Sequence, residues 1–341
     1  MDDFIGMRAS SISECWFNER PAIGQAEALI GLERVFQFIV GSREPAYHIA
    51  YAGPKLFGQE TAVGRRLRIC LPLVARVSPA YDFSEALVAM LSSVWVSRST
   101  YGLTWDALCD GACMASKEAM NLAVDMMRQR VREPWFRDAI KHRREELRLR
   151  AASLEKYTRA VLAERSRTLV VRVDLSYKEA AQLGLTVDQA FADREQLIAC
   201  LQQSALFERM TGYAWTWHHG LRKGYHLHTV FFLDGSRVCR DIDMADHIGR
   251  LWQKITEWDG IFHNCNLDKG RYTRCGIGMI SRSNDEQCEA TVHAVRYLGV
   301  QEGRDESEFD QYMRMKPMGA RIFGRGAEPD GSVRVGRPTL R

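Results

Sequence analysis

No apolar run in this 341-residue sequence approaches the roughly 18 residues that a membrane-spanning helix needs. The opening residues Met1, Asp2 and Asp3 lead into neither the basic segment nor the apolar segment of a secretory signal. The glycine-rich lysine loop that cradles nucleotide phosphates is also missing. These absences predict a cytoplasmic protein with no membrane partner, and they argue against an ATP-driven motor.

Cysteines are present, but their spacing does not indicate a disulfide framework. Their number, nine, is odd, and most lie within apolar or helical stretches, so we expect reduced thiols in a reducing compartment. Zinc-ligand spacing is incomplete around Cys109 and Cys113, and around His263, Cys265 and Cys275. The net charge of +4 neither requires nor excludes a polyanionic partner.

Length and composition predict two folded domains, because the chain exceeds the roughly 100–200 residues of an average domain and 46% of it is hydrophobic. Apolar residues recur at helical spacing from about Ser84 to Glu164, whereas the run around Leu67–Val77 suggests a strand. Basic residues within 141–150 could contact phosphate. Acidic residues alternate with them at i,i+4 spacing, so a solvated charged face is the favoured interpretation.

The pattern changes at Arg167, after which strands and helices alternate. β-branched residues predict a buried strand at Thr168–Tyr177, followed by a helix capped by Thr186. The expected elements after that helix are a hairpin, a helix, a short strand and a last helix, at 213–218 with 225–233, 244–258, 275–281 and 285 to about 300. This order predicts an α+β fold, an antiparallel sheet with helices on one face.

The most informative string is YHLH, in which His226 and His228 lie in one strand of the hairpin. Side chains alternate along a strand, so these two imidazoles point to the same face and can reach one metal ion. His218, across the turn, is the chosen third ligand. His219 is the fallback, because a one-residue slip of register exchanges the two faces. The competing interpretation is a polar strand face without a metal.

The last expected helix carries a candidate nucleophile. It begins with an S-x-x-E capping box at Ser283, and His293 and Tyr297 share one of its faces. A phenol with a pKa near 10 attacks poorly unless a metal or a base activates it. Tyr297 is therefore either a core aromatic or a nucleophile beside a metal-bearing sheet.

Several longer strings carry a resemblance to a known family: TLVVRVDLSY, GYHLHTVFFLDG, LWQKIT, DGIFHNCN, CGIGMIS, VRYLGV and DQYMRMKPMGARIFGRG. With them, residues from Thr168 to about Gly326 resemble the inovirus gene-two-protein replication family, also called the YagK/YfjJ C-terminal domain, of filamentous phages and prophages. Such proteins are similar to HUH endonucleases, in which a His-hydrophobic-His strand binds Mg²⁺ or Mn²⁺ and a helix tyrosine cuts one DNA strand.

The resemblance implies nicking and joining of single-stranded DNA to initiate rolling-circle replication in a bacterial host. His226 and His228, with His218, would hold Mg²⁺ or Mn²⁺. Tyr297 would become bonded to the 5′ phosphate and release a 3′ hydroxyl. The implied partners are single-stranded or origin DNA, a host helicase and a polymerase.

The implied domains are an HUH-like palm at 166–326, a mainly helical region of unassigned role at 1–165 before it, and a basic flexible tail at 327–341. Basic side chains of the hairpin turn and the C-terminal region are the expected DNA contacts: Arg222, Lys223, Arg314, Arg321 and Arg325. Aromatic residues of the hairpin could stack on unpaired bases or, the favoured interpretation, fill the core: Trp215, Trp217, Phe231 and Phe232.

Two departures from the family pattern matter. Related initiators read Tyr-x-x-Lys, but Val300 stands where the lysine would be. Lys316 is the candidate replacement cation, and Tyr312 with Lys316 offers an alternative nucleophile. The missing lysine also leaves open a catalytically inactive DNA-binding or regulatory prophage protein. A carboxylate is expected as third ligand, and His218 in its place shifts the metal preference toward Mn²⁺.

Overall fold

The computed structural model describes residues 25–78, 80–204, 207–220, 223–299 and 315–329. These residues form two compact units. The first, here called the helical unit, contains residues up to Arg143 and the segment 315–319. The second, the sheet unit, contains the remainder. This division falls inside one long helix, earlier than the expected boundary at 165.

The helical unit is mainly α-helical, as predicted, and also carries two short antiparallel ribbons, β1 with β2 and β3 with β9. Its elements are α1 (Gln25–Gly41), β1 (Tyr47–Ala52), β2 (Lys55–Glu60), α2 (Ala62–Arg76), β3 (Tyr81–Phe83), α3 (Glu85–Thr100), α4 (Trp105–Asp110), α5 (Met114–Arg130), the start of α6 (Pro134–Glu164), and β9 (Met315–Pro317).

The strand suggested around Leu67–Val77 is wrong, because that segment lies in α2. Thr61 caps the helix by accepting a hydrogen bond from the Gly64 amide at 3.1 Å. The buried positions Leu67, Cys70, Leu71 and Val74 recur at 3.6-residue spacing. The internal proline and the β-branched residues hid this period.

The sheet unit is built on six antiparallel strands. Its elements are the rest of α6, β4 (Arg167–Tyr177), α7 (Glu179–Gln182), α8 (Val187–Gln202), β5 (Met210–Gly220), β6 (Gly224–Asp234), α9 (Asp241–Ile255), β7 (Gly260–Asn264), β8 (Gly278–Ser281), α10 (Asp285–Gly299) and β10 (Phe323–Arg325), with 3₁₀ turns at Phe207–Arg209 and Lys269–Arg271. The strand order is β10-β5-β6-β4-β7, and β8 also pairs with β4.

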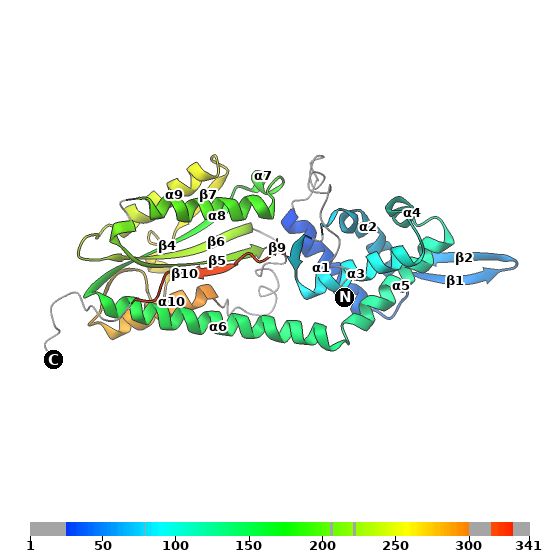
Figure 1. The fold of residues 1–341 in the computed structure, drawn as a ribbon, viewed down its shortest axis with the longest axis horizontal. Helices are drawn as coiled ribbons and strands as arrows, with labels where there is room; N and C mark the ends of the chain where they lie inside the picture. Colours follow the sequence, from blue (N-terminus) through cyan, green and yellow to red (C-terminus); the bar gives the residue numbers. More distant parts are fainter. Residues whose placement is uncertain (1–24, 79, 205–206, 221–222, 300–314, 330–341) are drawn as a thin grey trace. The chain divides into compact units, whose positions relative to one another are not determined.

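Helices cover both faces of this sheet, so the predicted one-sided packing is wrong (Figure 1). All eleven residues of β6 are buried, and a strand buried on both faces needs cover on both. Even-numbered side chains such as Val230 and Phe232 join a core with α6 and α10. On the other face, Trp252 of α9 packs edge-on against Tyr177, at 5.3 Å between ring centroids.

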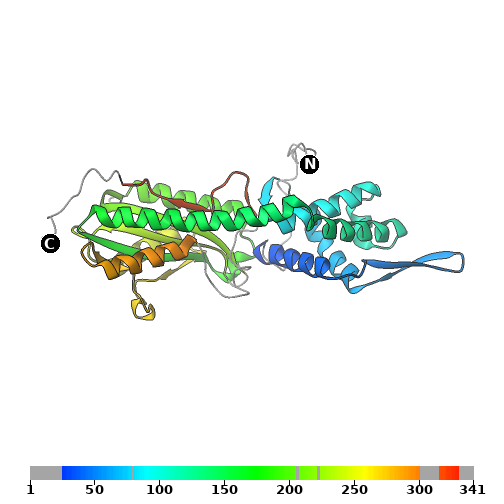
Figure 2. The ribbon, with the colours of Figure 1, turned by 90° about the horizontal axis from the view of Figure 1, so that it is seen from below.

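α6 and α10 run beside each other on the face where Val230 and Phe232 point (Figure 2). Arg159 of α6 forms an ion pair with Glu289 of α10, which ties the two helices together at their exposed edges. Gly276 allows the backbone before β8 to approach α10 closely, because a Cβ there would overlap the carbonyl oxygen of Ala290. This contact fixes the position of α10 over the sheet.

We therefore expect Gly276→Ala to lower the free energy of unfolding by about 1–3 kcal/mol, since the added methyl group forces the α10 backbone away from the sheet. Urea denaturation followed by circular dichroism measures this. Gly270→Ala is the matched control, because nothing lies within 4 Å of a Cβ at that position. Equal unfolding midpoints for the two variants would contradict the close approach.

Candidate metal centre

Three histidines converge where the β5–β6 hairpin closes. The register pairs His218 with His226 and pairs Thr216 with His228, so all three imidazoles project from the same face. One ligand nitrogen of each lies within 4.8 Å of the others. Their ring centroids are 4.8 to 5.6 Å apart. The structure thus brings together the three expected ligands, here called the His triad.

His219, the fallback ligand, does not join this cluster. It pairs in register with Tyr225, on the opposite face of the sheet, and its ring stacks on that tyrosine at 4.6 Å between centroids. The turn itself explains the register. Gly220 pairs with Gly224, which has a φ of +56° that only glycine adopts readily.

The contacts of His226 and His228 leave one ring nitrogen of each available to a metal ion. His226 Nδ1 lies 3.0 Å from the Gly224 carbonyl oxygen, and His228 Nδ1 lies 2.7 Å from Asp174 Oδ1. A donor role for each Nδ1 directs the Nε2 lone pair away from these partners, as in metal-binding histidines. Both ring nitrogens of His218 are buried, and within the described residues neither meets the geometric criteria for a hydrogen bond. Buried polar atoms of this kind fit the coordination of an ion.

Burial keeps the imidazoles of His218 and His226 neutral, which is the form that binds metals. Burial and the neighbouring His228 lower the pKa of His226 to about 3. Burial, followed by the other two imidazoles, lowers the pKa of His218 well below its ordinary value. A divalent ion would therefore meet two ligands that do not have to lose a proton first.

Asp174 of β4 is a functional candidate that the sequence reasoning missed. It pairs in register with His228 and so points to the same face. Burial alone would raise its pKa, but His228 and Arg172 outweigh burial and hold the pKa below its usual range. A buried carboxylate of this kind orients a metal-binding imidazole. The signal was present in the sequence: Arg172, Asp174 and Ser176 alternate with apolar residues in the strand.

α10 lies over the same face and brings its last turn to the His triad. Val295 and Leu298 are buried against the sheet. The backbone of Leu298 raises the pKa of His218, an effect smaller than the lowering by burial. Tyr297 precedes Leu298 and is 39% exposed. The interpretation of Tyr297 as a core aromatic is therefore wrong.

The other predicted site residues lie apart or outside the described residues. Arg222, Tyr312 and Arg314 are outside them. Lys316 belongs to β9 of the helical unit, where its Nζ is 3.1 Å from Asp82 Oδ2. It thus belongs to a different unit from the His triad.

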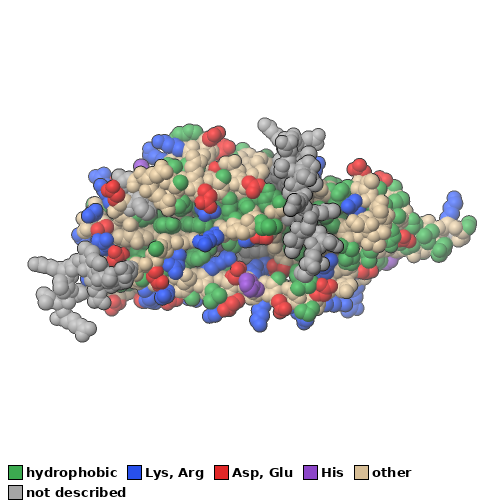
Figure 3. All heavy atoms as spheres, viewed as in Figure 1, with side chains coloured by type: hydrophobic (Ala, Val, Ile, Leu, Met, Phe, Trp, Pro, Cys, Tyr) green, Lys and Arg blue, Asp and Glu red, His purple; other side chains and the backbone are tan. Residues whose placement is uncertain are grey.

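Of the expected DNA contacts that can be described, only Lys223 lies at the His triad. It is exposed in the hairpin turn, and its charge acts on His226 and Asp174. Arg321 is exposed, whereas Arg325 donates a 3.0 Å hydrogen bond to Ser153 and so serves packing within the sheet unit. Basic and acidic side chains are interspersed on the face seen in Figure 3.

Three alternatives from the sequence are also decided. The hairpin aromatics fill the core, as favoured, since each is at most 6% exposed: Trp215, Trp217, Phe231 and Phe232. Several arginines of α6 form ion pairs with glutamates, which supports the solvated-face interpretation. Among the residues that the structure describes, no cysteine joins a group that could hold a metal.

We expect Mn²⁺ to bind the chelator-treated protein in isothermal calorimetry, and His218→Ala to abolish most of this binding because it removes a ligand. Asp174→Asn should weaken the affinity about 10- to 100-fold, the usual cost of losing the carboxylate that orients a ligand. His263→Ala is the control, since that side chain is 52% exposed and outside the cluster. Wild-type affinity in His218→Ala would contradict the site.

We also expect acid to destabilise the metal-free protein. An unfolded histidine binds a proton below about pH 6.5, whereas folded His226 does so only near pH 3, so the free energy of unfolding falls as the pH drops between these values. Each buried neutral histidine contributes at most about 1.4 kcal/mol per pH unit. Urea titrations from pH 7.5 to 4.5 should show a shallower loss for the His218→Gln, His226→Gln double variant. An unchanged pH slope in that variant would contradict neutral burial.

Within the described residues, no helix is long and apolar enough to cross a membrane. Residues 136–299, just under half of the chain, match the model of the family described as the YagK/YfjJ C-terminal domain. No curated protein and no solved structure matches the chain. The matched segment includes the His triad, Asp174 and α10, so the part of the chain that carries the site is similar to this domain.

Proposed function

We propose that the sheet unit nicks and rejoins single-stranded DNA with a tyrosine nucleophile and a histidine-held Mg²⁺ or Mn²⁺, and so initiates rolling-circle replication of a filamentous phage or prophage. One observation carries the proposal. Three buried imidazoles converge on the face that α10 covers, and Tyr297 lies in the last turn of that helix, next to Leu298, whose backbone acts on His218.

In the proposed reaction, the Tyr297 oxygen attacks the scissile phosphorus. A Tyr–O–P bond forms, the P–O3′ bond breaks, and the 3′ oxygen takes up a proton while the phenolic proton is lost to solvent or a nearby base. A bound divalent ion would polarise the phosphate and offset its developing charge. The phosphotyrosine keeps the bond energy, so attack by a 3′ hydroxyl can rejoin the strand without ATP.

The chain's own residues supply orientation and charge. Asp174 and the Gly224 carbonyl hold the rings of His228 and His226, which keeps their Nε2 atoms directed at one point. Lys223, in the hairpin turn, supplies a cation whose charge acts on His226 and Asp174, and we assign to it the phosphate-steering role of the family lysine that Val300 replaces. Arg172, on the same face as Asp174, adds a second cation, which is partly buried.

The HUH assignment rests on topology and pattern. A central antiparallel strand that presents a His-hydrophobic-His pair, with a tyrosine-bearing helix over the same face, supports it. The match to the YagK/YfjJ C-terminal domain, a prophage-associated family, supports the phage or prophage setting. Because the sequence lacks a nucleotide-binding lysine loop, the proposed partners at the origin include a host helicase and a polymerase.

A second candidate function keeps the same fold without cleavage. Val300 in place of the family lysine favours a DNA-binding or regulatory prophage protein that does not cut. In that case the protein would bind DNA but form no covalent product with it.

We expect wild-type protein with Mn²⁺ and single-stranded circular DNA to form a covalent adduct that survives a denaturing gel. Tyr297→Phe should abolish the adduct because the ring stays but the attacking oxygen is gone. His228→Ala should reduce it at least 100-fold through loss of an ion ligand.

Tyr312→Phe is the matched control for the nucleophile and should retain the adduct. An adduct that survives Tyr297→Phe and is lost in Tyr312→Phe would overturn the assignment to Tyr297. Absence of any adduct from a wild-type protein that binds both Mn²⁺ and DNA would favour the regulatory function.

A further inference from the structure

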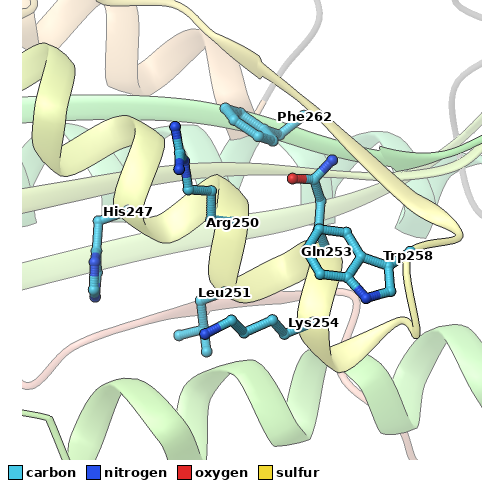
Figure 4. A pocket seen from close by; sticks show the side chains of 7 residues that line it. All are labelled: His247, Arg250, Leu251, Gln253, Lys254, Trp258 and Phe262. Carbon is cyan, nitrogen blue, oxygen red and sulfur yellow. The ribbon is translucent and has the colours of Figure 1, made fainter.

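A separate groove lies beside α9, on the face of the sheet opposite the His triad. Its volume is about 490 Å³, and its walls come from α9, from the turn after it and from β7 (Figure 4). The lining residues are His247, Arg250, Leu251, Gln253, Lys254, Trp258 and Phe262. Phe262 pairs in register with Leu175, which places it on the α9 side of the edge strand β7.

The basic residues of this groove form a stripe along one side of α9. His247, Arg250 and Lys254 are spaced by three and four residues, so they succeed one another along one face of the helix. All three are exposed, and no ion pair is found for them within the described part of the chain. The acidic residues of α9 are engaged elsewhere: Asp241 with Lys269, Asp243 with Arg240, and Asp246 with Asn264.

An aromatic platform ends this stripe. Trp258 is 59% exposed, although tryptophan is among the residues that gain most from burial. Its backbone is held at a φ of +72°, and that of Glu257 at +51°, a region that non-glycine residues seldom adopt. The Trp258 amide donates a 2.7 Å hydrogen bond to the Gln253 carbonyl, which fixes the turn and keeps the indole outside the core.

We propose that this groove binds single-stranded DNA, with Arg250 and Lys254 on the phosphates and Trp258 stacked on an unpaired base. Cations next to an exposed aromatic ring suit an unpaired nucleic-acid strand, because such a strand offers both a charged backbone and free base faces. A duplex hides its base faces, and an acidic peptide does not offer a ring face beside every backbone charge as an unpaired nucleic-acid strand does. The choice of DNA over RNA rests on the proposed function, and the groove would hold the strand apart from the cutting site.

The test is fluorescence anisotropy of a labelled 15-nucleotide oligo-dT with the full chain in EDTA, so that metal-dependent chemistry does not contribute. Trp258→Ala should weaken binding roughly tenfold through loss of stacking, while Trp258→Phe should retain most of it. The Arg250→Ala, Lys254→Ala double variant should bind more weakly and lower the slope of log affinity against log salt by about 1.4. Thermal melts verify that each variant folds.

The matched control for charge is Arg274→Ala with Lys55→Ala, which removes one exposed arginine and one exposed lysine outside the groove. The control for apolar exposure is Leu267→Ala, since Leu267 is 62% exposed. Both controls should bind like wild type. Wild-type affinity in Trp258→Ala and in the double variant would overturn the proposal, as would equal affinity for duplex DNA. Tighter binding of oligo-rU would overturn the choice of DNA.

The proposals for the groove and for the nicking site can be refuted independently. His228→Ala should lose the covalent adduct and still bind oligo-dT like wild type, whereas Trp258→Ala should bind weakly and still form the adduct at saturating DNA. Loss of the adduct from wild type with groove binding intact would refute only the nicking function.

Discussion

The antiparallel register between β5 and β6 is the constraint on which the site depends. With Gly220 opposite Gly224, the pairing sets His218 opposite His226 and puts three imidazoles on one face. A slip of one residue would put His219 opposite His226 and turn His218 to the other face of the sheet. The glycine at 224 protects the register, because its backbone is left-handed and a Cβ there would overlap the side chain of Gln182. Turn geometry therefore decides the chemistry of the face.

Burial on both sides of the central strands has a second effect. α6 and α10 pack on the face that carries the His triad, and burial there lowers the pKa of His218 and of His226. α8 and α9 cover the other face, so the outer side of α9 is free to carry charge. Two surfaces with different chemistry arise from one sheet, since alternate residues of each strand serve opposite layers.

Much of the sheet unit could be predicted from the sequence because its strands and its hairpin turn show in patterns of neighbouring residues. Alternation gave the shared face of His226 and His228, and the glycines gave the hairpin, so the position of His218 followed from local geometry. The second helical layer could not be read in this way. A strand buried on both sides looks continuously apolar, and nothing local says which helices cover it. Asp174 was overlooked for the same reason, because its partner His228 is distant in sequence and only strand pairing joins them. No strand was expected between 258 and 275, because the five residues of β7 are too few to show an alternating period.

The chain leaves the sheet unit after α10, contributes β9 to the helical unit, and returns as β10. The family match ends at residue 299, before this return. A fragment cut at that point would lack the strand that pairs with Thr216, Trp215 and Ala214, and would leave the backbone of this part of β5 without its partner strand. An open edge of this kind recruits strands from other molecules. A fragment that keeps this edge of β5 paired thus has to extend past the family match to include β10.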